Sequence, residues 1–561
     1  MPLVQLELMY KHITSVEQLP VFEPGLPVFC DIETDGLYTN PRIIQMYQPS
    51  KYTDVQIIDF DKIPYNTIME LLKPLHTVWY NASYDLGTLN IVTEKVDDMF
   101  YAVKIAFPEF QEYALDKTVS NMKLGNYYEN IDKKAMQKAR FIKGAYLSNA
   151  QLVYAATDTI VLNDIYNNDT IQKIINTNLA YKVDIYSLMH TIIWQQNGLD
   201  VIEYNRQKYL KDAKARIEQC KIFLPNLNVR SAKQVKEYLG SAASDKATLM
   251  RRIINEDDKE AQTILDLRKA LNEVSKLESY AFPKVYGKFN PYGTVTGRYN
   301  CSGGDLKNGI NMQNYPRQFK SIFGTADDDY IMLGADYATL EVRLACMVYG
   351  EASMYKALKQ GLDLHKYTAH LLTGKPMEDI TPDERTNAKP AVFGFTFGLS
   401  AANFVDYAFD LFGLKYTLEQ STTFRKGFFD AYPAFAEYHQ KAFRAMTKGN
   451  YIVYTALGRA IKPRLGTDAI NAPVQGSGGE CTKMAVHFMV KEDIRSLQTI
   501  VNVIHDAIYL KVLKSEQDYW ADLLERNMVK AWEEISKSSL FKYHDIPMPV
   551  EVGRGQTIKD T

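Results

Sequence analysis

The chain has 561 residues, more than one hydrophobic core accommodates, and this length predicts about three or four structural units. Hydrophobic residues make up 46% of it and aromatic residues 12%, which excludes a disordered protein. The formal net charge of −2 excludes an overall basic protein, so any surface that binds nucleic acid must be local. The five cysteines lack metal-type spacing, and there is no signal peptide or apolar run of membrane-spanning length. We therefore expect a cytoplasmic protein that does not bind membranes.

The first motif is a predicted strand that carries two carboxylates. An apolar run from Pro27 leads to Asp31 and Glu33, and alternate residues of a strand project from the same face. Neighbouring carboxylates repel each other unless a cation lies between them or one of them is protonated. A solvated acidic edge strand is the alternative interpretation.

Two later segments add carboxylates to this picture. Asp85 follows the apolar residues around Val78 and is expected to lie at the start of a helix. Tyr154 and Asp158 are four residues apart in a segment with helical spacing, so they share one helix face. Four converging carboxylates and a tyrosine would bind two divalent metals, which can activate water and stabilise the leaving oxygen of a phosphodiester.

In this order the motifs D-x-E, N-x3-D and Y-x3-D resemble those of the DEDD 3′–5′ exonucleases, tyrosine subtype, over about residues 25–170. The resemblance implies an RNase H-like exonuclease domain over residues 1–185 that takes a single-stranded DNA 3′ end. It implies that Tyr154 positions the attacking water and that Leu37 wedges against the terminal base. It also implies four metal ligands: Asp31, Glu33, Asp85 and Asp158.

Residues 181–280 are predicted to be rich in helices and contain no cluster of carboxylates, histidines or cysteines. Asn197-Gly198 is a turn signal that ends an apolar helix. Ser231 and Gln234 have the spacing of a capping box, and Gly240 can end the helix that they begin.

The second half of the chain is organised around residues 331–343. An apolar run predicts a buried strand that brings Asp336 to its end, just before a helix from about Leu340. A helix N-cap is the alternative role for a single aspartate in this position. A second aspartate, Asp506, lies between two apolar β runs and is predicted at the tip of a hairpin. On adjacent strands the two carboxylates could hold two Mg²⁺ ions and support phosphoryl transfer.

A helix is predicted to begin at Thr381, with Pro382 at its first position and Glu384 completing a capping box. Four of its residues recur at every fourth position and form one stripe: Arg385, Lys389, Phe393 and Phe397. Two cations followed by two aromatic rings suit a triphosphate with a base stacked beyond it. The alternative is an amphipathic helix whose aromatic residues lie in the core.

Residues 336–343, 385–398 and 505–506 resemble motifs A, B and C of the family A DNA polymerases, of the bacterial DNA polymerase I type. The match spans about residues 285–555. It implies a mixed α+β chain in which a right-hand polymerase follows the exonuclease domain. The expected parts are a thumb over 186–285, a palm over 286–360 and 450–561, and fingers over 361–449.

The resemblance also implies roles for single residues. The expected palm metal ligands are Asp336, Asp506 and the adjacent Tyr337. The triphosphate would be held by Arg385, Lys389 and His365, with Lys389 as proton donor to the leaving pyrophosphate. Glu341 matches the steric gate that excludes a ribose 2′-hydroxyl, Phe393 would pack against the incoming sugar, and Phe397 would lie beside the templating base. The expected primer–template contacts are Arg298, Asn314, Gln475 and His505.

Several residues depart from the family pattern. Pro390 lies inside the predicted helix, where a proline costs about 3 kcal/mol, so we predict a kink or a broken turn near Lys389. Ala507 stands where the family has a third acid, and Phe397 where it has tyrosine. Gly478 and Gly479 weaken the helix expected after Gln475.

The sequence therefore predicts DNA-templated DNA synthesis with 3′–5′ proofreading in DNA replication, with two Mg²⁺ ions, or Mn²⁺, in each active site. Expected partners are primer–template DNA, dNTPs and replisome proteins such as a helicase and a single-strand-binding protein, and the chain is expected to be a monomer. The absence of a preceding 5′-nuclease unit and the short thumb suggest a bacteriophage replicative enzyme, with an organellar or bacterial origin left open. Two alternatives remain: an exonuclease with a non-catalytic C-terminal DNA-binding module, and a single-subunit RNA polymerase.

Overall fold

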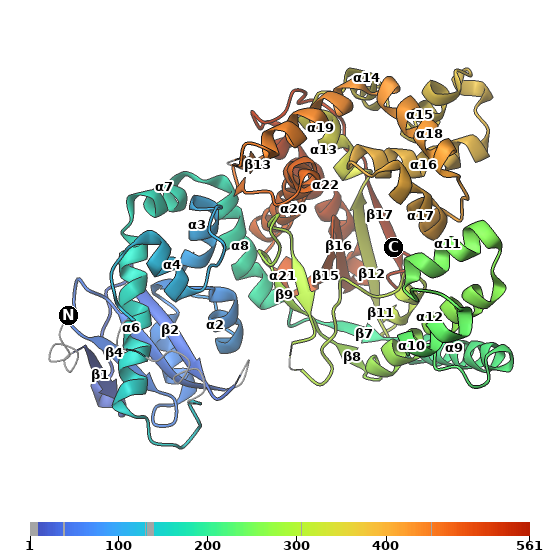
Figure 1. Cartoon of the computed structure of the whole chain (residues 1–561). Coiled ribbons are helices and arrows are strands. Elements are labelled where there is room, and N and C mark those ends of the chain that lie inside the picture. Colours follow the sequence, from blue (N-terminus) through green and yellow to red (C-terminus); the bar gives the residue numbers. More distant parts are fainter. Residues whose placement is uncertain (1–8, 37–39, 129–130, 132–139, 305, 450) are drawn as a thin grey trace.

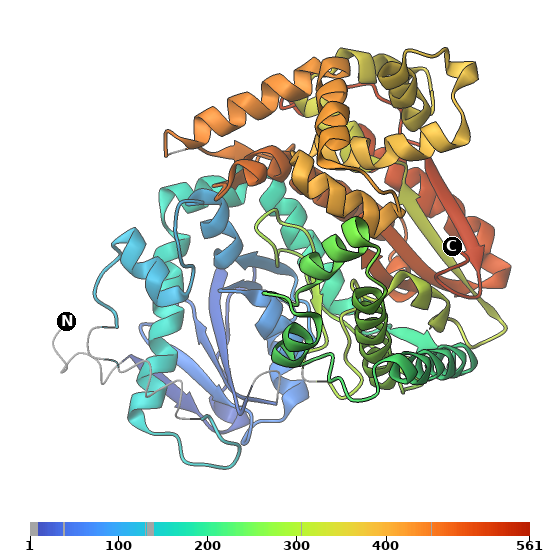
Figure 2. The ribbon, with the colours of Figure 1, turned by 45° about the vertical axis from the view of Figure 1, so that its right-hand side comes forward.

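The computed structural model describes residues 9–36, 40–128, 131, 140–304, 306–449 and 451–561 (Figure 1). Three groups of elements follow one another along the chain: a blue-to-teal N-terminal unit, the green helices, and a yellow-to-red C-terminal unit (Figures 1 and 2). Separate hydrophobic clusters fill the three groups. Among the described residues, no helix combines the length and hydropathy of a membrane-spanning segment.

The N-terminal unit is built on a mixed six-stranded sheet with the order β1-β4-β3-β2-β5-β6. Its strands are β1 (Tyr10–Ile13), β2 (Pro27–Thr34), β3 (Pro41–Tyr47), β4 (Val55–Asp59), β5 (His76–Trp79) and β6 (Lys95–Asp98). Its helices are α1 (Tyr65–Leu72), α2 (Ala82–Leu89), α3 (Met99–Ala106), α4 (Leu115–Met122), α6 (Asn149–Tyr166) and α7 (Asp169–Thr177). Helix α6 packs against β2, β3 and β4, which brings two of the predicted carboxylate motifs together.

Helix α8 (Leu179–Trp194) joins the N-terminal unit to the rest, because it packs against α2 and α3 on one side and α20 on the other. A small sheet with the order β11-β7-β8 follows. Its strands are β7 (Leu199–Val201), β8 (Lys284–Val285) and β11 (Phe323–Gly324). The green group consists of α9 (Glu203–Phe223), α10 (Ala232–Leu239), α11 (Lys246–Glu256) and α12 (Lys259–Ser279), with α9 and α12 packed along each other.

The caps of α10 match the sequence prediction in part. Ser231 caps the helix by accepting a hydrogen bond from the Gln234 backbone N–H, and Gly240 ends it in the left-handed conformation. The reciprocal half of the predicted capping box is wrong, because the Gln234 side chain accepts instead from the Asn228 backbone N–H.

The C-terminal unit is built on an antiparallel sheet with the order β15-β16-β12-β17. Its strands are β12 (Tyr330–Tyr337), β15 (Ile500–Ile504), β16 (Ala507–Leu513) and β17 (Val550–Gly555). The helices nearest to it are α13 (Leu340–Tyr349), α20 (Gly466–Glu492), α21 (Ser496–Thr499) and α22 (Gln517–Ser536). Two short hairpins, β9–β10 and β13–β14, comprise Lys288–Asn290 with Asn300–Ser302 and Val453–Tyr454 with Ala460–Ile461.

A helical group extends from one end of this sheet (Figure 1). It contains α14 (Ala352–Lys359), α15 (Leu364–Thr373), α16 (Pro382–Thr396), α17 (Ala401–Phe412), α18 (Leu418–Ala431) and α19 (Pro433–Met446). Helix α16 has the predicted capping box between Thr381 and Glu384. It continues through Pro390, so the predicted broken turn is wrong. Buried packing of the residues around Pro390 keeps the helix intact although proline cannot donate its backbone hydrogen bond.

Helix α20 differs from the prediction that a weak helix begins after Gln475. It begins at Gly466 and runs unbroken for 27 residues. Its glycines allow close approach of other segments. A Cβ on Gly476 would lie 2.4 Å from the Thr455 Cγ2 atom, and one on Gly479 would lie 2.9 Å from the Arg298 Cγ atom. The glycines therefore cost helix propensity but let the segment before Arg298 pack onto the helix.

Candidate active sites

The first candidate site is the pair Asp336 and Asp506 in the C-terminal unit. Asp336 lies near the end of β12, and Asp506 lies in the two-residue connection between β15 and β16. Strands β12 and β16 pair in a register that sets Ala335 opposite Ile508, which brings the two aspartates side by side. The following helix has Thr339 as its N-cap, so the alternative role of Asp336 as a helix cap is wrong.

Burial and mutual repulsion perturb this carboxylate pair. Burial, followed by the charge of Asp336, raises the pKa of Asp506 to about 7. Burial also raises the pKa of Asp336, although Lys320 and His505 partly oppose this shift. Because both carboxyl groups disfavour ionisation, the pair is suited to a site in which a cation compensates the charge.

Asp506→Asn is expected to raise the free energy of unfolding of the metal-free protein by about 2–4 kcal/mol at pH 8. The pKa of Asp506 is about 7 in the folded protein and 3.8 for an ordinary aspartate, so above pH 7 the folded state holds a charge that it disfavours. The gain should shrink to about 1–2 kcal/mol at pH 5, where the wild-type carboxyl is protonated in the folded state but still largely ionised in the unfolded one. Urea denaturation in EDTA at the two pH values measures the difference. A variant less stable than wild type at pH 8 would contradict the repulsion.

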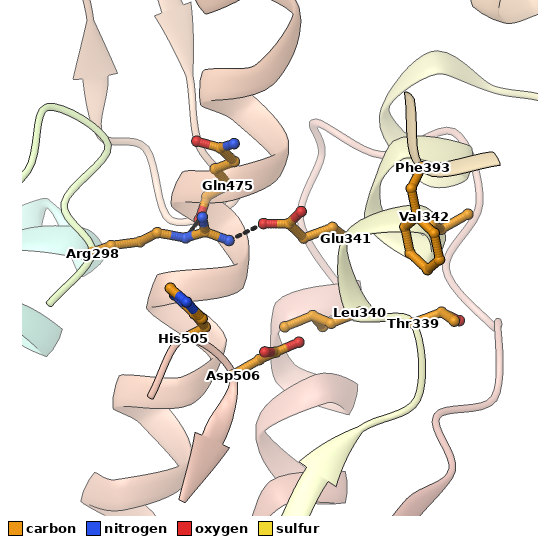
Figure 3. A pocket seen from close by; sticks show the side chains of 9 residues that line it. All are labelled: Arg298, Thr339, Leu340, Glu341, Val342, Phe393, Gln475, His505 and Asp506. Carbon is orange, nitrogen blue, oxygen red and sulfur yellow. Dashed lines mark hydrogen bonds and ion pairs between the residues drawn. The ribbon is translucent and has the colours of Figure 1, made fainter. Parts of the chain in front are cut away.

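A pocket of about 340 Å³ opens beside the pair (Figure 3). It is lined by Arg298, Thr339, Leu340, Glu341, Val342, Phe393, Gln475, His505 and Asp506. Arg298 and Glu341 reach toward each other across it and form an ion pair, while Arg298 Nε donates to the Gln475 carbonyl oxygen at 3.1 Å. The pocket thus contains one candidate metal ligand, the predicted gate and sugar-packing residues, and three of the four predicted primer–template contacts.

The predicted triphosphate residues lie near one another on two helices, with His365 on α15 and Arg385 and Lys389 on α16. Burial and the charges of Arg385 and Lys389 together lower the pKa of His365 to about 4, although the charge of Asp363 opposes this shift. Arg385 forms an ion pair with Asp363 at 2.7 Å. The His365 ring lies 5.5 Å from the ring of Phe393, which connects this cationic group to the pocket.

The aromatic residues of the stripe on α16 lie at the margin of the core. Phe393 and Phe397 are only partly buried but pack against the hydrophobic cluster of the C-terminal unit, whereas Phe395 is fully buried. Packing against the core and contact with a ligand therefore both remain possible roles for the two rings. Phe397 is the C-cap of the helix and does not line the pocket.

Two other predicted residues lie apart from the pocket lining. Asn314 is exposed in a turn in which its backbone N–H donates to the Asn311 carbonyl oxygen. The side chain of Tyr337 is buried, and its hydroxyl donates to the Met528 carbonyl oxygen at 2.9 Å. The prediction that Tyr337 is a metal ligand is therefore wrong for its side chain, and it stays a prediction only for its backbone.

The second candidate site is the carboxylate cluster of the N-terminal unit. Carboxylate oxygens of Asp31 and Glu33 on β2 and of Asp158 on α6 lie within 4.8 Å of one another. Burial raises the pKa of Asp31 well above its usual range, and the charges of Asp85, Glu33 and Asp158 raise it further. Burial also raises the pKa of Tyr154, as do Asp158, Glu33 and Asp31. The three sequence motifs therefore converge, and Leu37 lies outside the described residues.

One residue of this site was missed by the sequence analysis. The Tyr128 hydroxyl donates to Asp158 Oδ1 at 2.5 Å. Tyr128 also lines a concavity of about 610 Å³ together with residues of α4 and the loop that follows it. Its segment has no periodic pattern and no motif spacing, so only the folded structure connects it with Asp158.

Comparisons with known proteins concern most of the chain. Residues 199–560 match the family model described as DNA polymerase family A. "DNA polymerase I" of Aquifex aeolicus (strain VF5) is 25% identical over 97% of this chain and 98% of its own length. "DNA polymerase I" of Caldicellulosiruptor bescii is 26% identical over 44% of this chain, but this match covers only 30% of its own length. The solved structure "POL domain of Pol1 from M. smegmatis complex with DNA primer-template and dNTP" has a similar fold, with a TM-score of 0.74, 18% identity and coverage of 96% of this chain and 99% of that chain.

Proposed function

The chain belongs to DNA polymerase family A, and on this premise we propose that it synthesises DNA on a DNA template and proofreads with a separate 3′–5′ exonuclease site. The observation that carries the proposal is the Asp336–Asp506 pair beside a pocket that also contains Glu341, Phe393 and Arg298. The substrates would be primer–template DNA, dNTPs and, at the second site, a single-stranded 3′ end.

The charge of the Asp336–Asp506 pair fits divalent cations, since two buried carboxylates with raised pKa values need positive charge to remain ionised. Asp336 and Asp506 would hold Mg²⁺ or Mn²⁺, which when bound lower the pKa of a primer 3′-hydroxyl and compensate charge on the reacting phosphate. Arg385, Lys389 and His365 would bind the triphosphate, and Lys389 would protonate the leaving pyrophosphate. Arg385 must then exchange its ion pair with Asp363 for the phosphate oxygens.

The domain assignment follows the element groups. We propose a thumb over 186–285 that contains α9 to α12, a palm over 286–360 and 450–561 that contains the β15-β16-β12-β17 sheet, and fingers over 361–449 that contain α15 to α19. The exonuclease domain would occupy residues 1–185. Arg298, Gln475, His505 and Asn314 would contact the primer–template.

Glu341→Ala is expected to reduce discrimination against ribonucleotides by about 10- to 200-fold. Truncation of this side chain opens the pocket wall where a 2′-hydroxyl would otherwise collide. The measurement is the ratio of kcat/KM for dCTP and CTP on one primer–template. Glu341→Gln keeps the side-chain volume and should keep most of the discrimination. Unchanged sugar selectivity in the alanine variant would contradict the gate role.

In the N-terminal site, two divalent cations would be held by Asp31, Glu33, Asp85 and Asp158. The close approach of the carboxylates and the raised pKa values of Asp31 and Asp85 fit such a site. Tyr154 would position the attacking water. It lies one turn before Asp158 on the same helix, and it is close enough to the cluster for the carboxylates to raise its pKa. Tyr128 would orient the Asp158 carboxylate.

Tyr128→Phe is expected to lower the rate of 3′–5′ excision roughly 10-fold, because it removes one hydrogen bond to a charged group at the site. Excision of single-stranded DNA under single-turnover conditions measures this. Tyr127→Phe is the matched control, since it removes a similar hydrogen bond to Asp164 outside the cluster. Equal excision rates in both variants would show that Tyr128 has no positioning role.

Primer extension with each dNTP omitted in turn tests the proposed function. Synthesis should stop one nucleotide before each templated position of the missing dNTP, and the wild-type protein should shorten the primer when all four are absent. An exonuclease with a C-terminal module that only binds DNA would shorten primers without extending them. An RNA polymerase would extend with ribonucleotides in preference to dNTPs.

A further inference from the structure

A cluster of four charged side chains lies fully buried where α8, α20 and the β13–β14 hairpin meet. Its members come from segments far apart in the sequence: Asp184, Arg459, Glu480 and Lys483. Asp184 accepts hydrogen bonds from Arg459 at 2.7 Å and from Lys483 at 2.6 Å. Arg459 Nε lies 3.5 Å from Glu480 Oε1. The two cations and two anions balance each other, so we call this group the four-charge cluster.

The cluster holds the backbone of the turn over residues 294–298. The Lys483 ammonium group donates to the Gly297 carbonyl oxygen. Gly297 has a φ of +76°, and a Cβ at this position would lie 2.4 Å from the guanidinium carbon of Arg459. One cation of the cluster therefore binds the turn while the other packs directly against it.

The turn leads into Arg298, whose position it determines. Thr294 Oγ1 accepts from the Arg298 backbone N–H at 2.9 Å, and the Gly297 N–H donates to the Thr294 carbonyl oxygen at 3.1 Å. From this fixed backbone, the Arg298 side chain crosses the pocket to the Gln475 carbonyl oxygen and to Glu341 (Figure 3). A shift of the Gly297 carbonyl would move the Arg298 guanidinium group within the pocket.

The N-terminal unit covers the other side of the cluster. The Arg459 guanidinium group lies 4.3 Å from the centroid of the Tyr292 ring, and Lys104 of α3 lies 4.4 Å from the same ring. Tyr101 of α3 packs edge-on against Tyr292, with the ring centroids 5.0 Å apart. The cluster is therefore closed off from water by elements of both units.

Stability alone does not account for such a cluster, because apolar side chains of similar volume often stabilise a core at least as well as buried ion pairs do. Ion pairs differ from apolar contacts because each donor and acceptor fixes a particular backbone or side-chain position. Here the Lys483 ammonium group fixes the position of the Gly297 carbonyl oxygen.

We propose that Asp184 and Lys483 are positioning residues that hold Arg298 for its contact with the minor groove at the primer terminus. This inference rests on the proposed function, in which Arg298 contacts the primer–template. Helix α8, which carries Asp184, and the interior of α20, which carries Lys483, would then help the polymerase to sense the newly formed base pair. The minor-groove edge of every Watson–Crick pair presents acceptors at purine N3 and pyrimidine O2, which a guanidinium group can bind.

The test uses primers that end in guanine or in 3-deazaguanine, which lacks the minor-groove N3 acceptor. Wild-type protein should extend the 3-deazaguanine primer at least about 10-fold more slowly, since one charge-assisted hydrogen bond is lost. Arg298→Ala should extend both primers at similar, low rates. The double variant Asp184→Asn with Lys483→Met, which keeps the cluster neutral overall, should likewise lose most of the sensitivity to 3-deazaguanine.

The matched control is Arg42→Met with Asp59→Asn, which removes a buried ion pair of the N-terminal unit. It should keep the full wild-type sensitivity. Asp184→Asn alone is nearly isosteric and should show an intermediate loss, so it serves if the double variant does not fold. Excision of single-stranded DNA and the melting temperature report whether each variant is folded.

The outcomes separate the two proposals. If wild-type protein ignores the 3-deazaguanine substitution, the minor-groove role proposed for Arg298 fails. If wild-type protein is sensitive and Arg298→Ala is not, but the folded cluster variants keep the wild-type ratio, the positioning role of the four-charge cluster is overturned.

Discussion

Asp336→Asn is expected to lower the rate of primer extension by at least about 10³-fold while excision of single-stranded DNA continues at the wild-type rate. Asparagine keeps the size of the side chain but removes the charge that would bind a cation beside Asp506. Single-turnover incorporation of one dNTP measures the loss, and trimming of a single-stranded oligonucleotide measures the retained activity.

Asp328→Asn is the control for this result, because it removes an exposed carboxylate from the loop that precedes β12. It should leave both rates unchanged. Extension that survives Asp336→Asn would remove the basis for placing the polymerase site at the Asp336–Asp506 pair. Loss of both activities together, with normal folding, would contradict the independence of the two sites.

Asp31→Asn combined with Glu33→Gln is expected to have the converse effect, with excision lowered at least about 10³-fold and extension unchanged. These two side chains provide two of the three carboxylates whose oxygens lie within 4.8 Å of one another. Removal of both charges leaves Asp158 and Asp85 without the partners that would share a cation with them. Trimming of a single-stranded oligonucleotide measures the loss, and single-turnover incorporation of one dNTP measures the retained activity.

Glu94→Gln is the control here, since it changes an exposed carboxylate of the same unit just before β6. This variant should excise single-stranded DNA at the wild-type rate. Persistent excision in the double variant would show that the carboxylate cluster is not the nuclease site.

Motif spacing and periodicity predicted the parts of the structure that depend on local sequence. The two apolar runs around His505-Asp506 indicated a hairpin, and the structure places both residues in the connection. Likewise, the spacing of Thr381, Pro382 and Glu384 predicted the start of α16. Such signals succeed because each depends on only a few neighbouring residues.

Contacts between distant segments could not be predicted in this way. The hydrogen bond between Lys483 and Asp184 joins residues 299 positions apart, and the bond between Tyr128 and Asp158 crosses from a loop to a helix. Rules of propensity also failed where packing overrides them. The glycines of α20 and Pro390 of α16 were expected to weaken or break their helices, but tertiary contacts bury both segments and the helices continue.

The conversion of a single dNTP to dNMP on a primer–template tests most directly whether one chain carries both activities. With only the next templated dNTP present, wild-type protein should insert it, excise it and release dNMP continuously, and a non-templated dNTP should give none. Asp336→Asn and the Asp31→Asn, Glu33→Gln variant should each fail to produce dNMP from dNTP, and a mixture of the two should restore production. Release of dNMP that does not depend on the template, or that continues in either variant alone, would contradict the account.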